Sequence, residues 1–261
     1  MKSLSIASTG MLAQQLNVEV IANNIANLNT TAFKRQRAEF QDLLYQNLNR
    51  AGAQSSNAGT ITPTGIQLGV GVKTGAVYRI TQQGDMIQTE NSLDMAVNGR
   101  GYFRVQLPNG SDAYTRAGSF QLSPQGIIVT AEGNPVQPSV TIPQDAVDVT
   151  INQQGEVQVK LAGQVTPSIA GTLELAIFPN EAGLEAIGSN MLLETPASGA
   201  ASIGAPNSPG FGTIVQGFLE TSNVNAVTEI TNLITAQRAY EMNSRVIATA
   251  DEMMSAVSNL R

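Results

Sequence analysis

Three carboxylates near predicted turns, Asp85, Glu90 and Asp94, are candidates for acid–base chemistry. No spacing among them singles out a pair that would share a proton or a substrate. Asp251 and Glu252 are adjacent on a predicted helix, so their side chains project in different directions. The chain has no His and no Cys, which excludes Ser-His-Asp and Cys-His nucleophiles, redox pairs and disulfides. A zinc site would need carboxylate ligands alone, so we expect no enzyme activity, no catalytic residue, no cofactor and no metal site.

Two short segments could in principle bind an anion. Residues Gly69–Gly75 are glycine-rich, but they lack the spacing of a phosphate-binding loop and precede an apparent strand rather than a helix, which favours a flexible β connection. Lys34, Arg35 and Arg37 form the only basic cluster, and in a chain of net charge −6 they indicate a solvated or salt-bridged turn. The acidic balance predicts no nucleic-acid partner.

The composition predicts a folded protein that packs closely against others. Charged residues make up 13% of the chain, against roughly 25% in a typical soluble domain, and amide and hydroxyl side chains take their place. Such surfaces suit contact with identical copies, because few charges must lose their water. The hydrophobic content of 42% is too high for a disordered chain.

The sequence predicts no membrane insertion, because no run of about 18 apolar residues occurs. The first residues alternate polar with apolar and no cleavage site follows, so we expect no cleaved signal peptide. A cytoplasmic protein and a protein exported by a route without a cleaved peptide both remain open.

The N-terminal segment over residues 3–28 is predicted to be a helix, because it has no Pro and its apolar residues repeat every seven positions. Ser3 is the expected N-cap. One seam position is formed by Leu4, Met11, Val18 and Ile25, and the other by Ala7, Gln14, Ile21 and Leu28.

The C-terminal segment over residues 223–260 also lacks Gly and Pro and is predicted to be a helix that begins near Ser222 or Asn223. Small Ala residues in its seam would let a partner helix come close, and Asn243 is a polar seam residue of the kind that fixes register. Its two seam positions are Leu233, Tyr240, Ile247 and Met254, and Ala236, Asn243, Ala250 and Val257.

The region between the helices is predicted to be a meander of antiparallel hairpins, because short runs rich in Val, Ile, Thr, Tyr and Phe alternate with Gly, Pro and Asn turn signals. The expected strands are Met95–Val97, Tyr102–Leu107, Ala113–Thr115, Gly118–Leu122, Ile127–Thr130, Val147–Ile151, Glu156–Lys160 and Thr172–Phe178. Residues 46–65 and 196–212 are expected to be loops, or extended arms ordered by neighbours.

These features predict an α+β fold in three parts. Residues 1–30 and 223–261 form a helical coiled-coil core domain, residues 31–70 a connecting arm, and residues 71–222 a central all-β domain. Two helices that pack only against each other leave much of each helix surface exposed to solvent. We therefore expect both ends to be frayed in a lone chain and to fold against other copies. The alternative is an ordinary α+β domain whose terminal helices lie on its own sheet.

The end of the first helix resembles a signature of bacterial flagellar rod and hook proteins, which read Asn-Asn-Ile-Ala-Asn, then Asn-Thr, a small pair, an aromatic residue and Lys. Ala32 stands where Gly is usual. The matching residues are Asn23, Asn24, Ile25, Ala26, Asn27, Asn29, Thr30, Phe33 and Lys34.

Two further blocks resemble the same family in the same order. Residues 93–103 and 114–120 are similar to its β-domain, and residues 217–225 with 237–243 and 251–253 are similar to its closing motif. The resemblance therefore spans nearly the whole chain. The length and the polar stretch Gln46–Gly65 favour the distal part of the rod, with the proximal rod and the hook as alternatives.

This resemblance implies a hollow helical shaft made of many copies of the chain, built in the basal body across the periplasm. Subunits would leave the cell through the flagellar type III export apparatus without a cleaved signal. The implied partners are other copies, proximal rod proteins, hook or hook–rod junction proteins, and the surrounding periplasmic and outer-membrane ring proteins.

The resemblance also implies a role for each segment. The terminal helices would pair as an inner coiled-coil core with the β-domain outside, and polar residues of the C-terminal helix would face the channel. The residues expected to carry assembly are Leu4, Met11, Val18, Ile21, Ile25 and Leu28 with Leu233, Tyr240, Asn243, Ile247, Met254 and Val257. An arm that braces neighbouring subunits and stiffens the shaft would include Gln46, Ala53, Gly59, Pro63 and Gly65.

Two other classes of function compete with this expectation. One is a secreted β-rich adhesin or exporter tip module with helical ends, and the other is an enzyme, which the missing His and Cys disfavour.

Overall fold

The computed structural model describes residues 2–49, 64–164 and 166–259, and it divides the chain into two compact units. The helical unit comprises Met1–Ala26, Gln36–Tyr78 and Asn225–Arg261, and the β unit comprises Asn27–Arg35 and Arg79–Val224. Across the described ranges, no helix combines the length and the hydropathy that a bilayer crossing requires.

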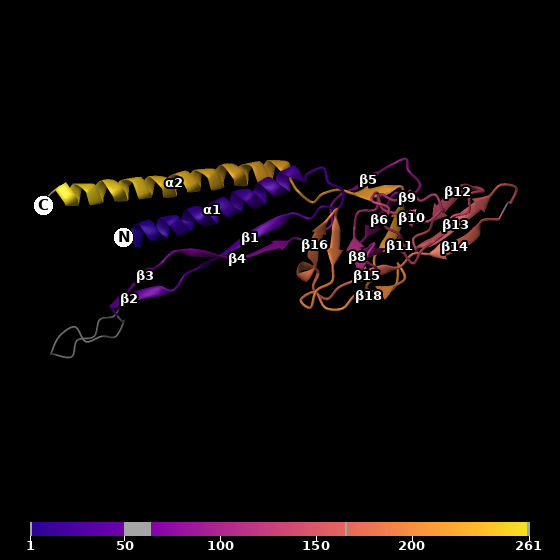
Figure 1. Cartoon of the computed structure of the whole chain (residues 1–261), viewed down its shortest axis with the longest axis horizontal. Coiled ribbons are helices and arrows are strands. Elements are labelled where there is room, and N and C mark those ends of the chain that lie inside the picture. Colours follow the sequence, from indigo (N-terminus) through magenta and orange to yellow (C-terminus); the bar gives the residue numbers. More distant parts are fainter. Residues whose placement is uncertain (1, 50–63, 165, 260–261) are drawn as a thin grey trace. The chain divides into compact units, whose positions relative to one another are not determined.

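The helical unit is built on two long antiparallel helices, α1 (Lys2–Ala26) and α2 (Ala226–Asn259), which lie side by side in Figure 1. Asn24 contacts Glu229 near one end of the pair, and Gly10 faces Asn243 further along. A Cβ atom at Gly10 would lie 2.9 Å from the Asn243 Nδ2 atom, so a larger residue there would require the Asn243 side chain to shift.

The second helix begins at Ala226, three or four residues later than its expected start at Asn223 or Ser222. Asn225 is the cap: its Oδ1 atom accepts a hydrogen bond from the Thr228 amide at 3.1 Å. Asn223 cannot serve as a cap, because its side chain bonds to the backbone of two other segments.

A two-stranded ribbon occupies much of the stretch expected to be a connecting arm. Strand β1 (Gln36–Asp42) pairs with β4 (Val72–Arg79), and β2 (Tyr45–Asn49) pairs with β3 (Ile66–Gly69). The ribbon runs along α1, where the Val72 amide donates to Thr9 Oγ1 at 3.4 Å and Lys2 Nζ donates to Gln46 Oε1 at 2.6 Å. The helical unit therefore has three components, and the sequence pattern had indicated only the two helices.

The β unit consists of antiparallel sheets. Its largest sheet has the order β16-β17-β8-β7-β15-β18, with β11 also paired to β7, and a separate sheet has the order β12-β13-β14. The strands of these two sheets are β7 (Tyr102–Gln106), β8 (Asp112–Thr115), β11 (Val136–Gln137), β12 (Ala146–Ile151), β13 (Glu156–Leu161), β14 (Ser168–Thr172), β15 (Leu175–Ile177), β16 (Glu185–Gly188), β17 (Met191–Leu193) and β18 (Ser202–Gly204).

Three short pairs complete the unit, and two of them join its beginning to its end. Strand β19 pairs with β6, and β20 pairs with β5, while β9 and β10 form a local hairpin. The antiparallel strand-rich region is confirmed, but these long-range pairs make it more than a meander of neighbouring hairpins. The bounds are β5 (Met86–Gln88), β6 (Met95–Asn98), β9 (Gln121–Leu122), β10 (Ile128–Val129), β19 (Thr213–Gln216) and β20 (Phe218–Glu220).

The core of the β unit lies between these sheets. Phe103 and Phe120 pack edge to face, with ring centroids 5.1 Å apart, among buried aliphatic side chains of the 95–214 region. A smaller cluster centres on Phe178, which packs edge to face against Tyr102 and Tyr114. This burial gives the β unit an apolar core of its own.

Candidate functional site

The strongest candidate site in the β unit is a buried ion cluster, which we call the junction: Lys34, Arg116 and Glu220. Exposed fractions are 8% for Lys34, 5% for Arg116 and 1% for Glu220. Lys34 Nζ donates to Glu220 Oε1, and Arg116 Nε donates to Glu220 Oε2 at 2.9 Å. One carboxylate thus holds two cations, and each member comes from a different one of the three motif blocks.

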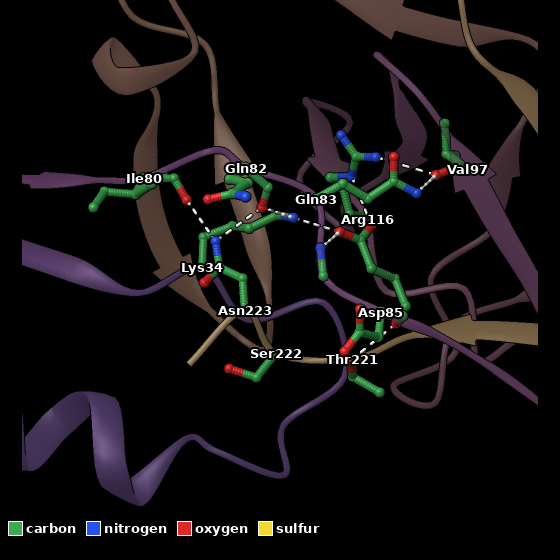
Figure 2. A network of polar contacts seen from close by, with 12 residues as sticks. Lys34, Ile80, Gln82, Gln83, Asp85, Val97, Arg116, Thr221, Ser222 and Asn223 are labelled. Atoms are coloured by element: carbon green, nitrogen blue, oxygen red, sulfur yellow. Dashed lines mark hydrogen bonds and ion pairs between the residues drawn. The ribbon is translucent and has the colours of Figure 1, made fainter. Parts of the chain in front are cut away.

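Backbone groups add further hydrogen bonds to the junction, as Figure 2 shows for Lys34, Gln82 and Arg116. Lys34 Nζ also donates to the Gln82 carbonyl at 2.9 Å, and the Gly84 amide donates to Glu220 Oε1 at 3.0 Å. Gly84 has no room for a side chain, because a Cβ atom would lie 2.1 Å from the Thr221 carbonyl oxygen. The chain itself therefore shields the junction from nearly all solvent.

Arg116 ties the ion cluster to strand β6 and the turn that follows it. Its Nη2 atom donates to the carbonyls of Val97 at 3.2 Å and Gly99 at 2.7 Å, and its guanidinium lies 5.6 Å from the centroid of the Tyr102 ring. Gln83 bonds to the same segment through the Val97 carbonyl and the Gly99 amide. A side chain with several fixed donors suits this place better than Lys would.

Asn223 fastens together three chain segments beside the junction, and Figure 2 shows its side chain pointing toward Ile80 and Gln82. Its Oδ1 atom accepts from the Arg35 amide at 2.8 Å, and its Nδ2 atom donates to the carbonyls of Ile80 at 2.9 Å and Gln82 at 2.8 Å. Each of these segments continues within a few residues into the helical unit. Asn223 therefore holds together three stretches of the β unit that lie far apart in the sequence.

The electrostatics of the junction are those of a structural site. Burial lowers the pKa of Lys34, and the neighbouring Glu220 carboxylate opposes that shift. Burial also raises the pKa of Tyr102 above its usual range. No group here combines an open position with a nucleophile or a general base, so the arrangement can hold segments together but offers no reaction.

A second buried polar cluster lies in the helical unit, between α1, α2 and β1. The Asn24 side chain donates to the Gln36 carbonyl at 2.8 Å and to Glu229 Oε2 at 3.2 Å, and it accepts from the Gln36 amide at 2.8 Å. Asn24 and Glu229 are both buried. Asn24, a residue of the motif, therefore links α1 to α2 and to the first residue of β1.

The structure places the expected assembly residues at different depths. Ile21 is buried, Tyr240 and Met254 are exposed, and Leu28 lies beyond the end of α1. Those that are partly buried are Leu4, Met11, Val18, Ile25, Leu28, Leu233, Asn243 and Ile247. The side chain of Val257 lies outside what the structure describes.

The motif and arm residues also differ in how far they are exposed to solvent. Asn24 and Lys34 are buried, while Asn23, Ala26 and Asn29 are exposed. Ile25, Asn27, Thr30 and Phe33 are partly buried. In the expected arm, Gln46 is exposed and Gly65 is partly buried, and Ala53, Gly59 and Pro63 lie outside the described residues.

Ala32, which stands where the motif usually has Gly, adopts a left-handed backbone conformation with φ 57°. This conformation is the physical reason for a Gly preference, since a Cβ atom makes it costly. Its amide donates to the Glu220 carbonyl at 2.8 Å, which places this turn beside the junction.

Residue chemistry alone did not single out Glu220, Arg116 and Asn223 as site residues. A usable signal was present for Arg116, because it lies between the expected strands Ala113–Thr115 and Gly118–Leu122 in a chain with few charges. Charged residues in such segments are candidates for buried pairs. The basic cluster was expected to be solvated or salt-bridged, and Lys34 is salt-bridged.

Three family models match successive parts of the chain. They are described as flagella basal body rod protein (residues 4–34), flagellar hook protein FlgE/F/G D1 domain (residues 96–159) and flagellar basal body rod FlgEFG protein C-terminal (residues 215–260). Lys34 and Glu220 fall within the first and the last of these, and Arg116 within the middle one.

Full-length relatives give the same result. The chain is 62% identical over 261 residues to the flagellar basal-body rod protein FlgG of Caulobacter vibrioides, with all of both chains covered. It is 51% identical to FlgG of Agrobacterium fabrum, covering 99% of this chain and 98% of that one, and 37% identical to FlgG of Bacillus subtilis, covering 100% and 99%. The chain therefore belongs to the FlgG family of flagellar basal-body rod proteins.

Proposed function

We propose that this chain is a structural subunit of the distal part of the bacterial flagellar rod, where copies polymerise into a rigid hollow shaft that transmits torque. The observation that carries the proposal is the full-length identity of 62% to a flagellar basal-body rod protein. The closed, ion-paired junction supports a structural role, since it holds segments together and exposes no reactive group.

The two helices serve in this proposal as a coiled-coil core made jointly by many copies. Large apolar side chains on α2, including Val227 and Met242, remain exposed after α1 has packed against it, which supports a need for further helices. Residues 1–30 and 223–261 would act as the core domain and 71–222 as the outer β-domain. A contact between different patches on successive copies does not close on itself, and it gives an open helical filament.

The proposed partners follow from that position. Besides other copies, they are the proximal rod proteins, the hook or hook–rod junction proteins, the periplasmic and outer-membrane ring proteins, and the type III export apparatus. Polar side chains of α2 would line the channel, where they present no apolar patch to an unfolded passenger.

Electron microscopy of the purified full-length chain at high concentration tests the proposal. We expect hollow tubes whose helical core contains α1 and α2, because their exposed apolar side chains lack partners in a single copy. Dispersed monomers at every concentration, with rods that assemble normally in cells lacking the chain, would favour an adhesin or tip module instead.

The ribbon is proposed to stiffen the shaft by bracing neighbouring copies. Its outer end exposes Leu44, Tyr45, Leu48 and Ile66, and an isolated two-stranded ribbon is marginally stable in water. Tubes made from a chain that lacks residues 46–65 are therefore expected to be more curved and more flexible in electron micrographs. Curvature and bending equal to those of the intact chain would show that the ribbon has no bracing role.

A further inference from the structure

The outer face of α2 carries a stripe of side chains that nothing within the helical unit covers. Val227, Ile230 and Ile234 are 75%, 49% and 46% exposed. Arg238 follows one turn later and is also exposed, and the spacing of three and four residues places all four on one face. Large exposed apolar stripes of this kind mark interaction sites.

The outer face of α1 carries a stripe of mostly small and polar side chains with a negative charge. Ala26, Ala22, Glu19, Gln15 and Leu12 are all exposed and repeat at the same helical spacing. Two small residues at its C-terminal end are followed by a carboxylate one turn away, so this stripe offers shallow hollows and a negative charge. Over the described parts of the chain, the Glu19 carboxylate accepts a hydrogen bond only from Gln15 Nε2, at 3.1 Å, and Arg238 makes no ion pair.

We infer that the α2 stripe of one copy docks antiparallel on the α1 stripe of a second copy, an inference that rests on the proposed function. One register seats Ile230 over Ala26 and Ile234 over Ala22. The same register brings Arg238 to Glu19 of the second copy. Successive residues of either stripe are three or four positions apart, which is about one helical turn, so the two stripes stay in step. Large side chains over small ones allow the two helices to approach closely.

The charges favour this pairing over the two symmetric alternatives. Docking α2 on α2 of another copy in parallel register would place Ile against Ile and Arg238 near a second Arg238. Docking α1 on α1 in parallel register would bring Glu19 near a second Glu19, and any α1–α1 contact leaves the apolar stripe of α2 uncovered. Like charges across an interface are unfavourable. The contact of α2 with α1 pairs opposite charges instead, and it can propagate from copy to copy.

Charge reversal in the full-length chain tests the inference. Glu19→Arg alone and Arg238→Glu alone are each expected to raise the critical concentration for sedimentable tubes at least tenfold, about 1.4 kcal/mol of contact energy. An equimolar mixture of the two single variants is expected to assemble nearly as the unchanged chain does, because each contact can then join opposite charges. Glu185→Arg, a reversal at an exposed site of the β unit, is the matched control and should have little effect.

The mixture separates a contact between copies from one within a copy. Rescue by the Glu19→Arg/Arg238→Glu double variant without rescue by the mixture would overturn the inference, and so would single variants that assemble normally. Either result would leave the proposed rod function intact if the unchanged chain still forms tubes.

A disulfide readout decides the inference even if the chain alone forms no tubes. The chain has no Cys, so Ala22→Cys and Ile234→Cys chains can be mixed and oxidised without background. A heterodimer in clear excess over the Ala22→Cys and Asn109→Cys control mixture is expected, since Asn109 is exposed in the β unit. Equal yields in both mixtures would contradict the docking.

Discussion

Replacing Glu220 by Gln is expected to lower the free energy of unfolding of the β unit by about 3–5 kcal/mol. The substitution keeps the size of the side chain but removes the negative charge that holds Lys34 and Arg116, both of which are buried. Two cations without a counter-charge would then remain in a site closed to water, and that desolvation is costly. Calorimetry of the full-length chain should show the loss as a lower melting temperature, on the order of 10 °C.

Two further variants separate a charge effect from a general packing effect. Glu185→Gln removes a carboxylate from an exposed strand position and should change stability by less than about 0.5 kcal/mol. Adding Lys34→Met to Glu220→Gln removes one of the two unpaired cations, so it should recover part of the lost stability. An unaltered melting temperature for Glu220→Gln, or a further loss on adding Lys34→Met, would show that the cluster does not stabilise the unit electrostatically.

The two ends of the chain were predictable from the sequence because their information is local. Long segments without Pro and with an apolar repeat strongly favour helices. The bounds of α1 and α2 agree with the predicted bounds to within about three residues. The error at the start of α2 has a specific cause. Asn223 has the side chain of a cap, but it bonds to Arg35, Ile80 and Gln82, which lie far away in the sequence.

Strand pairing and the junction were not predictable, because they depend on contacts between distant residues. The turn signals located hairpins such as β7–β8, but nothing local to β5 or β6 indicates that β20 and β19 pair with them. Lys34 and Glu220 are separated by 186 positions. A single sequence shows that each is charged, and only the fold shows that they share one buried site.

The ribbon was not predicted from the sequence for a different reason. Small polar residues between Gln46 and Gly65 favoured an irregular arm, and the pairing of β2 with β3 became visible only in the structure. The burial along β1 alternates, because one face of the strand turns toward α1. This alternation was weak in the sequence, since Gln36, Ala38 and Phe40 differ greatly in polarity.

Replacing Ile247 by Asp is expected to prevent polymerisation while the β unit stays folded. Ile247 is partly buried on α2, at the seam position it shares with Leu233 and Tyr240. A carboxylate there would have to lose its water among apolar side chains, both within one copy and wherever further helices complete the core. We expect the critical concentration for tubes to rise at least a hundredfold in sedimentation, about 2.7 kcal/mol, with an unchanged calorimetric transition of the β unit.

The outcome also decides between the two roles considered for the helices. Ile247→Leu keeps the apolar character and serves as the control, so it should assemble at close to the original concentration. The β unit has an apolar core of its own around Phe103 and Phe120, and none of it comes from α2. A lower melting temperature of the β unit in Ile247→Asp would mean that the helices stabilise their own sheet. Tube formation at the original concentration would mean that this face of α2 is no part of the assembly core.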